Sequence, residues 1–252
     1  MADVLLVRRD ARVLTLTLNR PDKRNALSSE LIARLAGELD VADLDPDVGV
    51  VVLRGEGRDF CAGADLGELR ASARREVSAN EADARRLGEV FVKIRTLPKP
   101  VVACVHGNAL AGGCGLATAC DLVVAAETAR LGYPEIQRGF VPAMVLVILR
   151  RLVGEQVAFD LVATGRMLTA PEAAALGLVS RVAPEAQLDQ TIDSVVRPLA
   201  EGSATALALT KKLLYELDGR DFADGVRLGA RVNAVARTTA DFRERIDRFL
   251  AR

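Results

Sequence analysis

The amino-acid sequence predicts an α/β fold in which most strands pair in parallel, followed by a region that contains only helices. Two observations support this prediction. Short apolar runs alternate with helical segments through the first 183 of the 252 residues, as in repeated strand–turn–helix units. After Val182, the periodic segments have helical spacing. We therefore divide the chain into an α/β core at residues 1–183 and a C-terminal helical region at residues 184–252.

The N-terminal part of the chain combines strands with one helix. The segments 4–7 and 13–18 form a predicted hairpin, because the second alternates Leu with Val or Thr as a strand with one buried face does. Ser28 can cap the helix that follows, whose apolar positions share one face: Leu31, Ile32, Leu35 and Leu39. Residues 48–53 form the next apolar strand.

A charged stretch and a helix lead to the centre of the chain. Residues 67–80 are charged and rich in Ala, which predicts an exposed helix or a mobile segment. Residues 82–97 have helical spacing, and Pro98 ends that helix. Pro100 then precedes the continuous apolar run 101–105, which is typical of a strand buried on both faces.

Residues 109–119 consist almost entirely of Ala, Gly, Cys and Leu, with Gly112, Gly113 and Gly115 near the start. Glycine inside a helix costs roughly 1 kcal/mol relative to Ala. The cluster therefore indicates either a helix packed tightly on the sheet or a ligand that approaches the backbone. The first N–H groups of a helix have no internal partner and carry partial positive charge, so an oxyanion would be stabilised there.

A second turn, at residues 60–66, has the same design. It follows a strand, is rich in Ala and Gly, and can leave backbone N–H groups free, so the two turns together could form an oxyanion hole. Glu135 adds a carboxylate in apolar surroundings, where desolvation raises the pKa of a glutamate and lets it transfer protons near neutral pH. From residue type alone, a solvated loop glutamate paired with Arg138 is the more common arrangement.

The remaining segments complete the fold prediction. Residues 122–126 form another strand, and two helices, at 142–152 and 155–163, are divided at Gly154. The segment from Thr169 to Glu172 has the pattern of a capping box. The C-terminal region is predicted to contain four helices, at 184–200, 203–217, 222–236 and 240–250.

The composition, 50% hydrophobic and 27% charged, is that of a globular protein with a large core. With 34 basic and 34 acidic residues and few aromatics, the chain has no general attraction to nucleic acid or anionic membranes. No apolar stretch reaches the roughly 20 residues of a membrane span, and no signal-peptide pattern begins the chain. The four cysteines lack CxxC spacing and the only histidine is His106, so we expect no metal site and a cytoplasmic protein with buried, reduced thiols.

Four segments occur in the order typical of one family: FCAGADL at 60–66, KPVVACVHGNALAGGCGLATACDLVVAA at 99–126, GYPEIQRGFVP at 132–142 and LVATGRMLTAPEAAALGLVSRV at 161–182. In this combination the chain resembles the crotonase superfamily, the enoyl-CoA hydratases and isomerases. The resemblance implies a crotonase-like spiral of ββα units, with C-terminal helices that assemble a homotrimer or a dimer of trimers. It also implies an enzyme of fatty acid metabolism that acts on acyl-CoA thioesters, with coenzyme A as part of the substrate and no separate cofactor.

The resemblance assigns roles by motif position. The backbone N–H groups of Ala64 and Gly112 would hold the thioester carbonyl. Glu135 matches the second of the family's two glutamates, with Pro134 beside it. The path of the substrate's coenzyme A is expected along one further set of residues: Arg24, Ala26, Leu27, Ala62, Asp65 and Leu66.

Gly115 departs from the family pattern, because the first family glutamate would stand there. Two glutamates around one water suit hydration, whereas moving a double bond requires one base that takes a proton and returns it two carbons away. The resemblance therefore favours hydration of a 2-enoyl-CoA with Glu135 as acid and base. Isomerisation is the close alternative, and a catalytically weak acyl-CoA- or RNA-binding scaffold is a third. The small residue at 115 also predicts an acyl pocket that binds a branched or bulky group.

Overall fold

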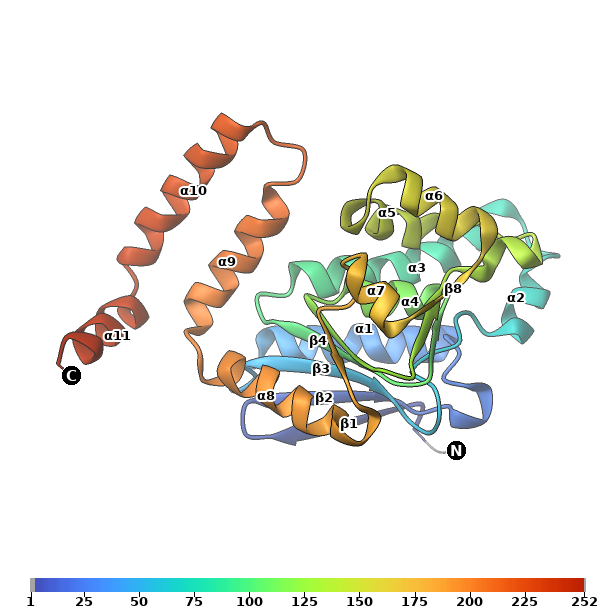
Figure 1. Ribbon diagram of the computed structural model, residues 1–252, viewed down its shortest axis with the longest axis horizontal. Coiled ribbons are helices and arrows are strands. Elements are labelled where there is room, and N and C mark those ends of the chain that lie inside the picture. Colours follow the sequence, from blue (N-terminus) through green and yellow to red (C-terminus); the bar gives the residue numbers. More distant parts are fainter. Residues whose placement is uncertain (1–2, 252) are drawn as a thin grey trace.

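The computed structural model describes residues 3–251 and is centred on a six-stranded sheet (Figure 1). Its strands are β1 Leu5–Asp10, β2 Val13–Leu18, β3 Val50–Gly55, β4 Val101–Val105, β6 Leu122–Ala126 and β9 Arg181–Ala183. They lie in the spatial order β1-β2-β3-β4-β6-β9, with β1 antiparallel to β2 and the other neighbours parallel. The predicted hairpin and the predicted strands in β3, β4 and β6 are confirmed, and β4 is buried along its whole length.

A second sheet of three short strands supports the functional region, and it was not predicted. β5 (Asn108–Leu110) pairs in parallel with β7 (Arg130–Gly132), which pairs antiparallel with β8 (Met167–Thr169). Leu110 lies opposite Gly132, so the chain leaves β5 and β7 at the same edge of this sheet. Two helices begin there: α4 (Gly112–Ala119) and the 3₁₀ helix η2 (Pro134–Arg138).

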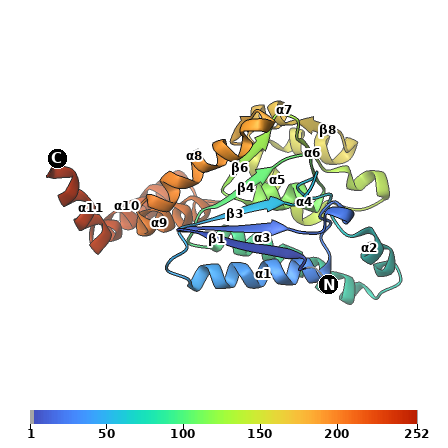
Figure 2. The ribbon, with the colours of Figure 1, turned by 90° about the horizontal axis from the view of Figure 1, so that it is seen from below.

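Helices cover both faces of the six-stranded sheet, with α1 on one side and α8 on the other (Figures 1 and 2). Their apolar side chains join those of the strands in one continuous core. The remaining helices of this part include α2, which covers the first residues of the stretch 67–80 that was predicted to be exposed helix or mobile. The bounds are α1 Ser29–Leu44, α2 Leu66–Ser72, α3 Val77–Thr96, α5 Ala143–Leu152, α6 Glu155–Thr164, α7 Ala170–Ala175 and α8 Leu188–Glu201.

The predicted helix caps are confirmed. The Ser28 hydroxyl accepts a hydrogen bond from the Leu31 N–H at 3.2 Å. Thr169 and Glu172 form both bonds of a capping box at the start of α7. Such bonds satisfy N–H groups that the helix itself leaves free.

The C-terminal helices α9 (Ala204–Glu216), α10 (Phe222–Arg237) and α11 (Ala240–Leu250) extend away from both sheets (Figures 1 and 2). The preceding helix α8 instead packs on the six-stranded sheet through its buried face: Leu188, Ile192, Val195, Val196 and Ala200. The departing region therefore begins at α9 rather than at residue 184. None of the described helices is both long enough and apolar enough to cross a bilayer.

Polar contacts hold α9 to the core. Lys211 is buried, and its ammonium donates to the carbonyls of Ile94 (2.7 Å) and Lys99 (2.9 Å) and to the Asp121 carboxylate (2.6 Å). The Tyr215 hydroxyl donates to the second oxygen of Asp121 at 2.8 Å. These bonds fix the direction in which the C-terminal helices leave the core.

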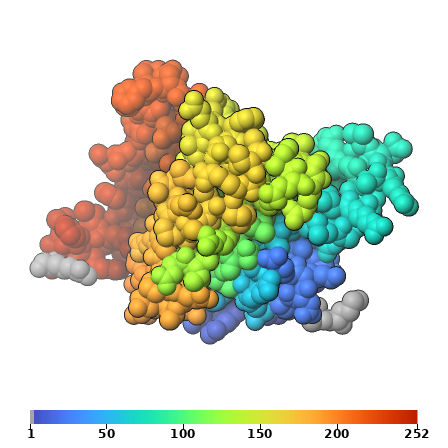
Figure 3. Space-filling model, turned by 45° about the vertical axis from the view of Figure 1, so that its right-hand side comes forward, coloured from blue at the N-terminus to red at the C-terminus, as the bar shows by residue number. Residues whose placement is uncertain are grey.

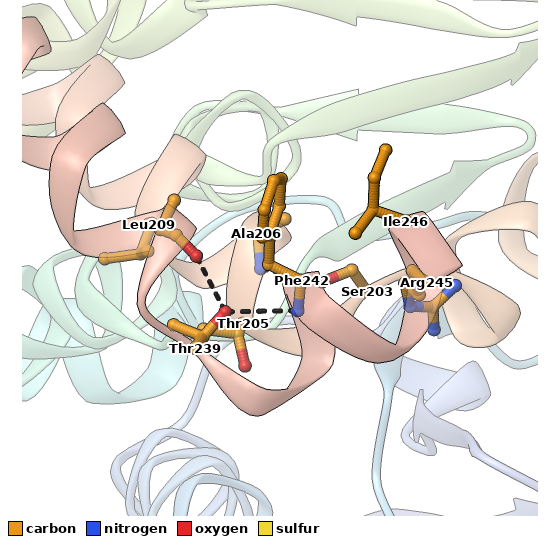
Figure 4. A pocket seen from close by; sticks show the side chains of 9 residues that line it. Ser203, Thr205, Ala206, Leu209, Thr239, Phe242, Arg245 and Ile246 are labelled. Atoms are coloured by element: carbon orange, nitrogen blue, oxygen red, sulfur yellow. Dashed lines mark hydrogen bonds between the residues drawn. The ribbon is translucent and has the colours of Figure 1, made fainter. Parts of the chain in front are cut away.

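A small apolar pocket of about 290 Å³ lies between α9, α10 and α11 (Figure 4). At its edge the Thr239 hydroxyl donates to the Ala236 carbonyl (2.8 Å) and accepts from the Phe242 N–H (3.2 Å), which ties the end of α10 to the start of α11. The rings and aliphatic chains of Phe242, Leu209 and Ile246 line the pocket. The three helices thus pack against one another, while α10 and α11 bury no residue against the core.

Candidate active site

The loop after β3 presents the Ala64 N–H as a free donor. Ala64 pairs with Leu27 in an isolated parallel bridge, in which the Leu27 N–H donates to the Gly63 carbonyl (2.8 Å) and the Asp65 N–H donates to the Leu27 carbonyl (3.0 Å). In this pattern the bonds to Leu27 come from the neighbours of Ala64, so the N–H of Ala64 itself points away. Within residues 3–251 it has no acceptor.

The second donor is the N–H of Gly112, the first residue of α4. It is also without an acceptor in the described chain, as expected for the first turn of a helix. The preceding residue, Ala111, has φ 52° and ψ −126°, a conformation that non-glycine residues rarely adopt. Its N–H is bonded to the Gly132 carbonyl (2.8 Å), which holds the strained turn on β7.

The two donors lie on neighbouring loops. A Cβ placed on Gly63 would stand 3.0 Å from the Ala111 Cβ and 3.8 Å from the Gly112 nitrogen. Ala64 and Gly112 both line one cavity of about 560 Å³. Two unpaired N–H groups on one cavity wall are the arrangement that stabilises a developing oxyanion.

Glu135 lines the same cavity from η2 and is buried, with 6% of its surface exposed. Its Oε2 atom has no hydrogen-bond partner within the described residues. Burial raises the pKa of this carboxyl, opposed by a bond to its own backbone and by the charge of Arg138. The buried carboxyl of Glu135 is therefore not the solvated glutamate that residue type alone would suggest, and its raised pKa favours the protonated form more than in an exposed glutamate.

Most of the residues expected at the substrate site do line this cavity: Arg24, Ala26, Leu27, Ala62, Asp65, Leu66 and Pro134. Two of them have charged groups that are already engaged. The Asp65 carboxylate caps α2 and pairs with Arg20 at 2.7 Å. The Arg24 guanidinium pairs with Asp59 at 2.7 Å. These side chains shape the cavity wall through bonds within the protein.

Gly115 does not line the cavity, so the expected enlargement of the acyl pocket at this position is wrong. A Cβ at residue 115 would stand 2.3 Å from the Val145 Cγ1 atom and 3.2 Å from Phe91 Cζ. The side chains of α5 and α3 therefore fill the space that a residue at 115 would occupy. Val145 itself lines the cavity, and its Cγ1 methyl overlaps the position that the Cβ of a larger residue at 115 would take.

Several cavity residues were not predicted. Leu87 from α3 and Met144 and Val145 from α5 contribute apolar wall, and Phe140 and Val141 stand at an exposed rim. In the space-filling view, the α2–α3 segment in cyan stands beside the yellow-green segment that contains η2 (Figure 3). In the sequence Leu87, Met144 and Val145 belong to helices in which apolar residues are expected to face the core, so only the tertiary structure shows that they border a cavity.

The fold and the cavity define a class of α/β protein in which two backbone N–H groups and one buried carboxylate face the same space. The sequence profile of a family described as Enoyl-CoA hydratase/isomerase matches residues 8–252, and the chain belongs to this family. This agrees with the resemblance seen in the four sequence segments.

Individual relatives support the same conclusion. The chain is 46% identical, over 94% of each chain, to a protein of Thermus thermophilus that is provisionally named an enoyl-CoA hydratase. It is 38% identical to the 2,3-dehydroadipyl-CoA hydratase of Escherichia coli, over 98% of this chain and 95% of that protein. The crystal structure of an enoyl-CoA hydratase from Mycobacterium smegmatis superposes with a TM-score of 0.94 at 36% identity, over 98% of this chain and 96% of the other. The predicted crotonase-like fold is confirmed.

Proposed function

We propose that this protein is an enoyl-CoA hydratase that adds water across the double bond of a 2-enoyl-CoA thioester. The observation that carries the proposal is one buried, unpaired carboxylate, Glu135, in the same cavity as two unpaired backbone N–H groups. The names of the relatives support the hydratase type of reaction. The coenzyme A part of the substrate would lie along the wall that contains Arg24, Ala62 and Leu66.

In the proposed reaction, ionised Glu135 takes a proton from water as the water oxygen bonds to C3 of the enoyl group. The electron pair of the double bond moves toward the thioester, and its oxygen becomes negative. The N–H groups of Ala64 and Gly112 stabilise that charge, and loss of one such donor typically costs about 10²–10³ in rate. Protonated Glu135 then gives its proton to C2, so one carboxyl group performs both transfers and ends ionised as it began.

Isomerisation between 3-enoyl and 2-enoyl thioesters is the second candidate, and one observation favours it. Val145 and Phe91 fill the space beside Gly115, so no second carboxylate is available there to orient a water molecule. A 1,3-proton shift requires only the single base Glu135 and the same oxyanion stabilisation. The catalytically weak acyl-CoA- or RNA-binding scaffold remains as the non-enzymatic alternative.

The reaction can be assigned by following the absorbance of the conjugated thioester. The protein is incubated separately with 2-enoyl-CoA and 3-enoyl-CoA esters of the same chain length. A hydratase removes the chromophore from the first ester, an isomerase creates it from the second, and a scaffold changes neither although it binds both. Absence of chromophore loss with 2-enoyl esters across several chain lengths would contradict the hydratase proposal.

The C-terminal helices support a further expectation, assembly into a homotrimer or a dimer of trimers. α10 and α11 expose large apolar side chains, among them Phe222, Val235 and Phe249. Exposed apolar surface of this kind is typical of an interface. Sedimentation equilibrium would distinguish a trimer, a hexamer and a monomer.

A further inference from the structure

The turn before the cavity wall is strained. Arg24 and Asn25 both have positive φ, 52° and 55°, which is uncommon for residues other than glycine. Ala26 and Leu27, which follow directly, line the cavity. A strained backbone of this kind persists only when its surroundings hold it in place, and such strain is concentrated at functional sites.

Asn25 is one of the two residues that hold this turn. It is fully buried, and its amide nitrogen donates to the carbonyls of Glu56 (2.8 Å) and Asp59 (2.7 Å). Its side-chain oxygen accepts from the Arg20 N–H at 2.9 Å. The amide thereby joins both ends of the turn to the loop that follows β3.

Asp59 is the second residue whose side chain holds the turn at Arg24 and Asn25. Its side chain is 1% exposed, and its carboxylate accepts from Arg24 Nε (2.7 Å), Arg58 Nε (3.1 Å) and the Asn108 N–H (2.9 Å). Burial opposes ionisation of this group, but the bonds from Arg24, Asn108 and Arg58 outweigh it and hold the pKa of Asp59 well below its usual value. A buried charge with this many donors bonds strongly to each segment that supplies one.

Three backbone bonds connect the strained turn to the oxyanion loop. The Ala62 N–H donates to the Arg24 carbonyl at 2.9 Å, and Leu27 exchanges bonds with Gly63 and Asp65. These bonds fix the peptide planes on each side of Ala64, and so determine where its N–H points. On the opposite edge the loop is bonded to the segment that leads to α4, since the Cys61 N–H donates to the Asn108 carbonyl (3.0 Å).

We propose that Asp59, together with Asn25, is a positioning residue for the oxyanion hole. Asp59 is bonded to the segments on both sides of the Ala64 loop, so it sets the direction of the Ala64 N–H relative to Gly112. Loss of this carboxylate would leave the donors present but misdirected, and the thioester carbonyl would be polarised less. This inference rests on the proposed function, because it requires a thioester bound between these two donors.

The test compares Asp59→Asn with the control Asp121→Asn. The control also replaces a carboxylate that accepts several hydrogen bonds, but at the C-terminal end of α4, away from the proposed oxyanion hole. The probe is a 2-enoyl-CoA ester conjugated to an aryl group, whose absorbance moves to longer wavelength when its carbonyl is polarised. Asp59→Asn is expected to lower kcat by about 10–10² with a smaller change in KM, since misplacement of catalytic groups by about 1 Å can cost 10²-fold. It should also reduce the wavelength shift of the bound probe. Asp121→Asn should lower the melting temperature but keep both kcat and the shift.

A second variant keeps the inference testable if Asp59→Asn does not fold. Asn25→Gly permits the same positive φ while removing the side-chain bonds, so it should reduce kcat and the wavelength shift in the same way. Normal kcat and a normal shift in either folded variant would overturn the positioning role. If the wild-type protein transforms neither 2-enoyl nor 3-enoyl esters, the proposed function fails, which is a separate and distinguishable outcome.

Discussion

The polar groups at the two ends of helix α4 differ in whether they have hydrogen-bond partners within the protein. At the N-terminal end, the Gly112 N–H has no acceptor, and the neighbouring Glu135 carboxylate has an oxygen without a partner. At the C-terminal end, Asp121 accepts bonds from the Val101 N–H (2.7 Å), from Lys211 (2.6 Å) and from Tyr215 (2.8 Å). One end leaves a donor and an acceptor free, and at the other both carboxylate oxygens are bonded.

This difference is the one expected between the proposed reacting site and a structural site. A buried polar group without a partner costs about 1–3 kcal/mol, so it persists only where something else favours it. At Gly112 and Glu135 a substrate can supply the missing bonds, because both residues line the cavity. At Asp121 the protein supplies all of them, and the result is the attachment of α9. Substitutions at the first end should change rate, and substitutions at the second should change stability.

The largest effect is expected for Glu135→Gln, which should lower kcat by about 10²–10⁴ because it removes the acid–base group. Acyl-CoA affinity and the fold should persist. In the wild type, the ionised form must accept the first proton, so kcat/KM should fall as the pH drops through the raised pKa of Glu135. Steady-state rates from pH 5 to pH 9 would measure this, and an unchanged kcat in the variant would exclude Glu135.

The same variant also has an expected effect on stability. Because burial raises its pKa, folded Glu135 binds its proton more tightly than the unfolded chain does. The resulting stabilisation is complete below the unfolded pKa and is lost as the pH rises through the folded pKa. Glu135→Gln should therefore match the wild type at low pH and be more stable at neutral pH, by urea titration. A variant less stable at neutral pH would show that the carboxylate has a structural partner.

Gly112→Val should lower kcat by about 10²–10³, as for loss of one oxyanion donor. A Cβ at residue 112 meets only the flexible ends of Leu27 (3.4 Å) and Leu87 (3.5 Å), so the added methyl groups would mainly occupy substrate space. Gly113→Ala is the matched control, because its Cβ would stand 2.4 Å from the Cys61 carbonyl oxygen and should cost stability instead. Equal losses of melting temperature in both variants, with normal specific activity of folded protein, would refute the oxyanion role of Gly112.

At the other end of α4, Lys211→Met should lower the free energy of unfolding by about 3–5 kcal/mol, because it leaves the Asp121 charge without its cation. The kcat of the protein that remains folded should be unchanged. Chemical denaturation and turnover, measured on one preparation, would check both. A selective loss of kcat would show that the two ends of α4 are coupled.

Gly115→Glu should destabilise the fold by about 1–3 kcal/mol rather than add hydratase activity, because its Cβ overlaps Val145. The double variant Gly115→Glu with Val145→Ala removes the closest methyl and should recover part of this loss. A well-folded single variant with faster hydration of short 2-enoyl esters would contradict the packing argument.

The smallest effect is expected for Ala64→Gly. The N–H is retained, and only backbone freedom increases, at a cost of roughly 0.5–1 kcal/mol. The rate should therefore fall by less than about tenfold, in contrast to Gly112→Val. A loss as large as that of Gly112→Val would mean that the Ala64 methyl group itself contacts the substrate.

The sequence predicted the elements whose signal is local. β4 follows from an apolar run, and the cap of α1 follows from a serine at the right place. The donors at Ala64 and Gly112 and the carboxylate of Glu135 were located through the family motifs. The three-residue strands β5, β7 and β8 were missed, because so short a segment has no measurable periodicity.

The parts that could not be predicted depend on contacts between distant residues. Asp59 bonds to Arg24 and Asn108, which lie 35 and 49 positions away in the chain. Nothing in the local sequence distinguishes it from an exposed turn aspartate. Val145 has the spacing of a core residue on an amphipathic helix, and only its distance from Gly115 shows that it replaces a side chain there.

The packing of Val145 against Gly115 also restricts how this protein can change over generations. A glutamate at residue 115 would place its Cβ 2.3 Å from the Val145 Cγ1 atom, so it packs without overlap only when residue 145 also becomes smaller. A smaller residue at 145 alone would open a gap in the cavity wall and add no carboxylate. A second carboxylate at this position therefore depends on two coupled substitutions rather than one.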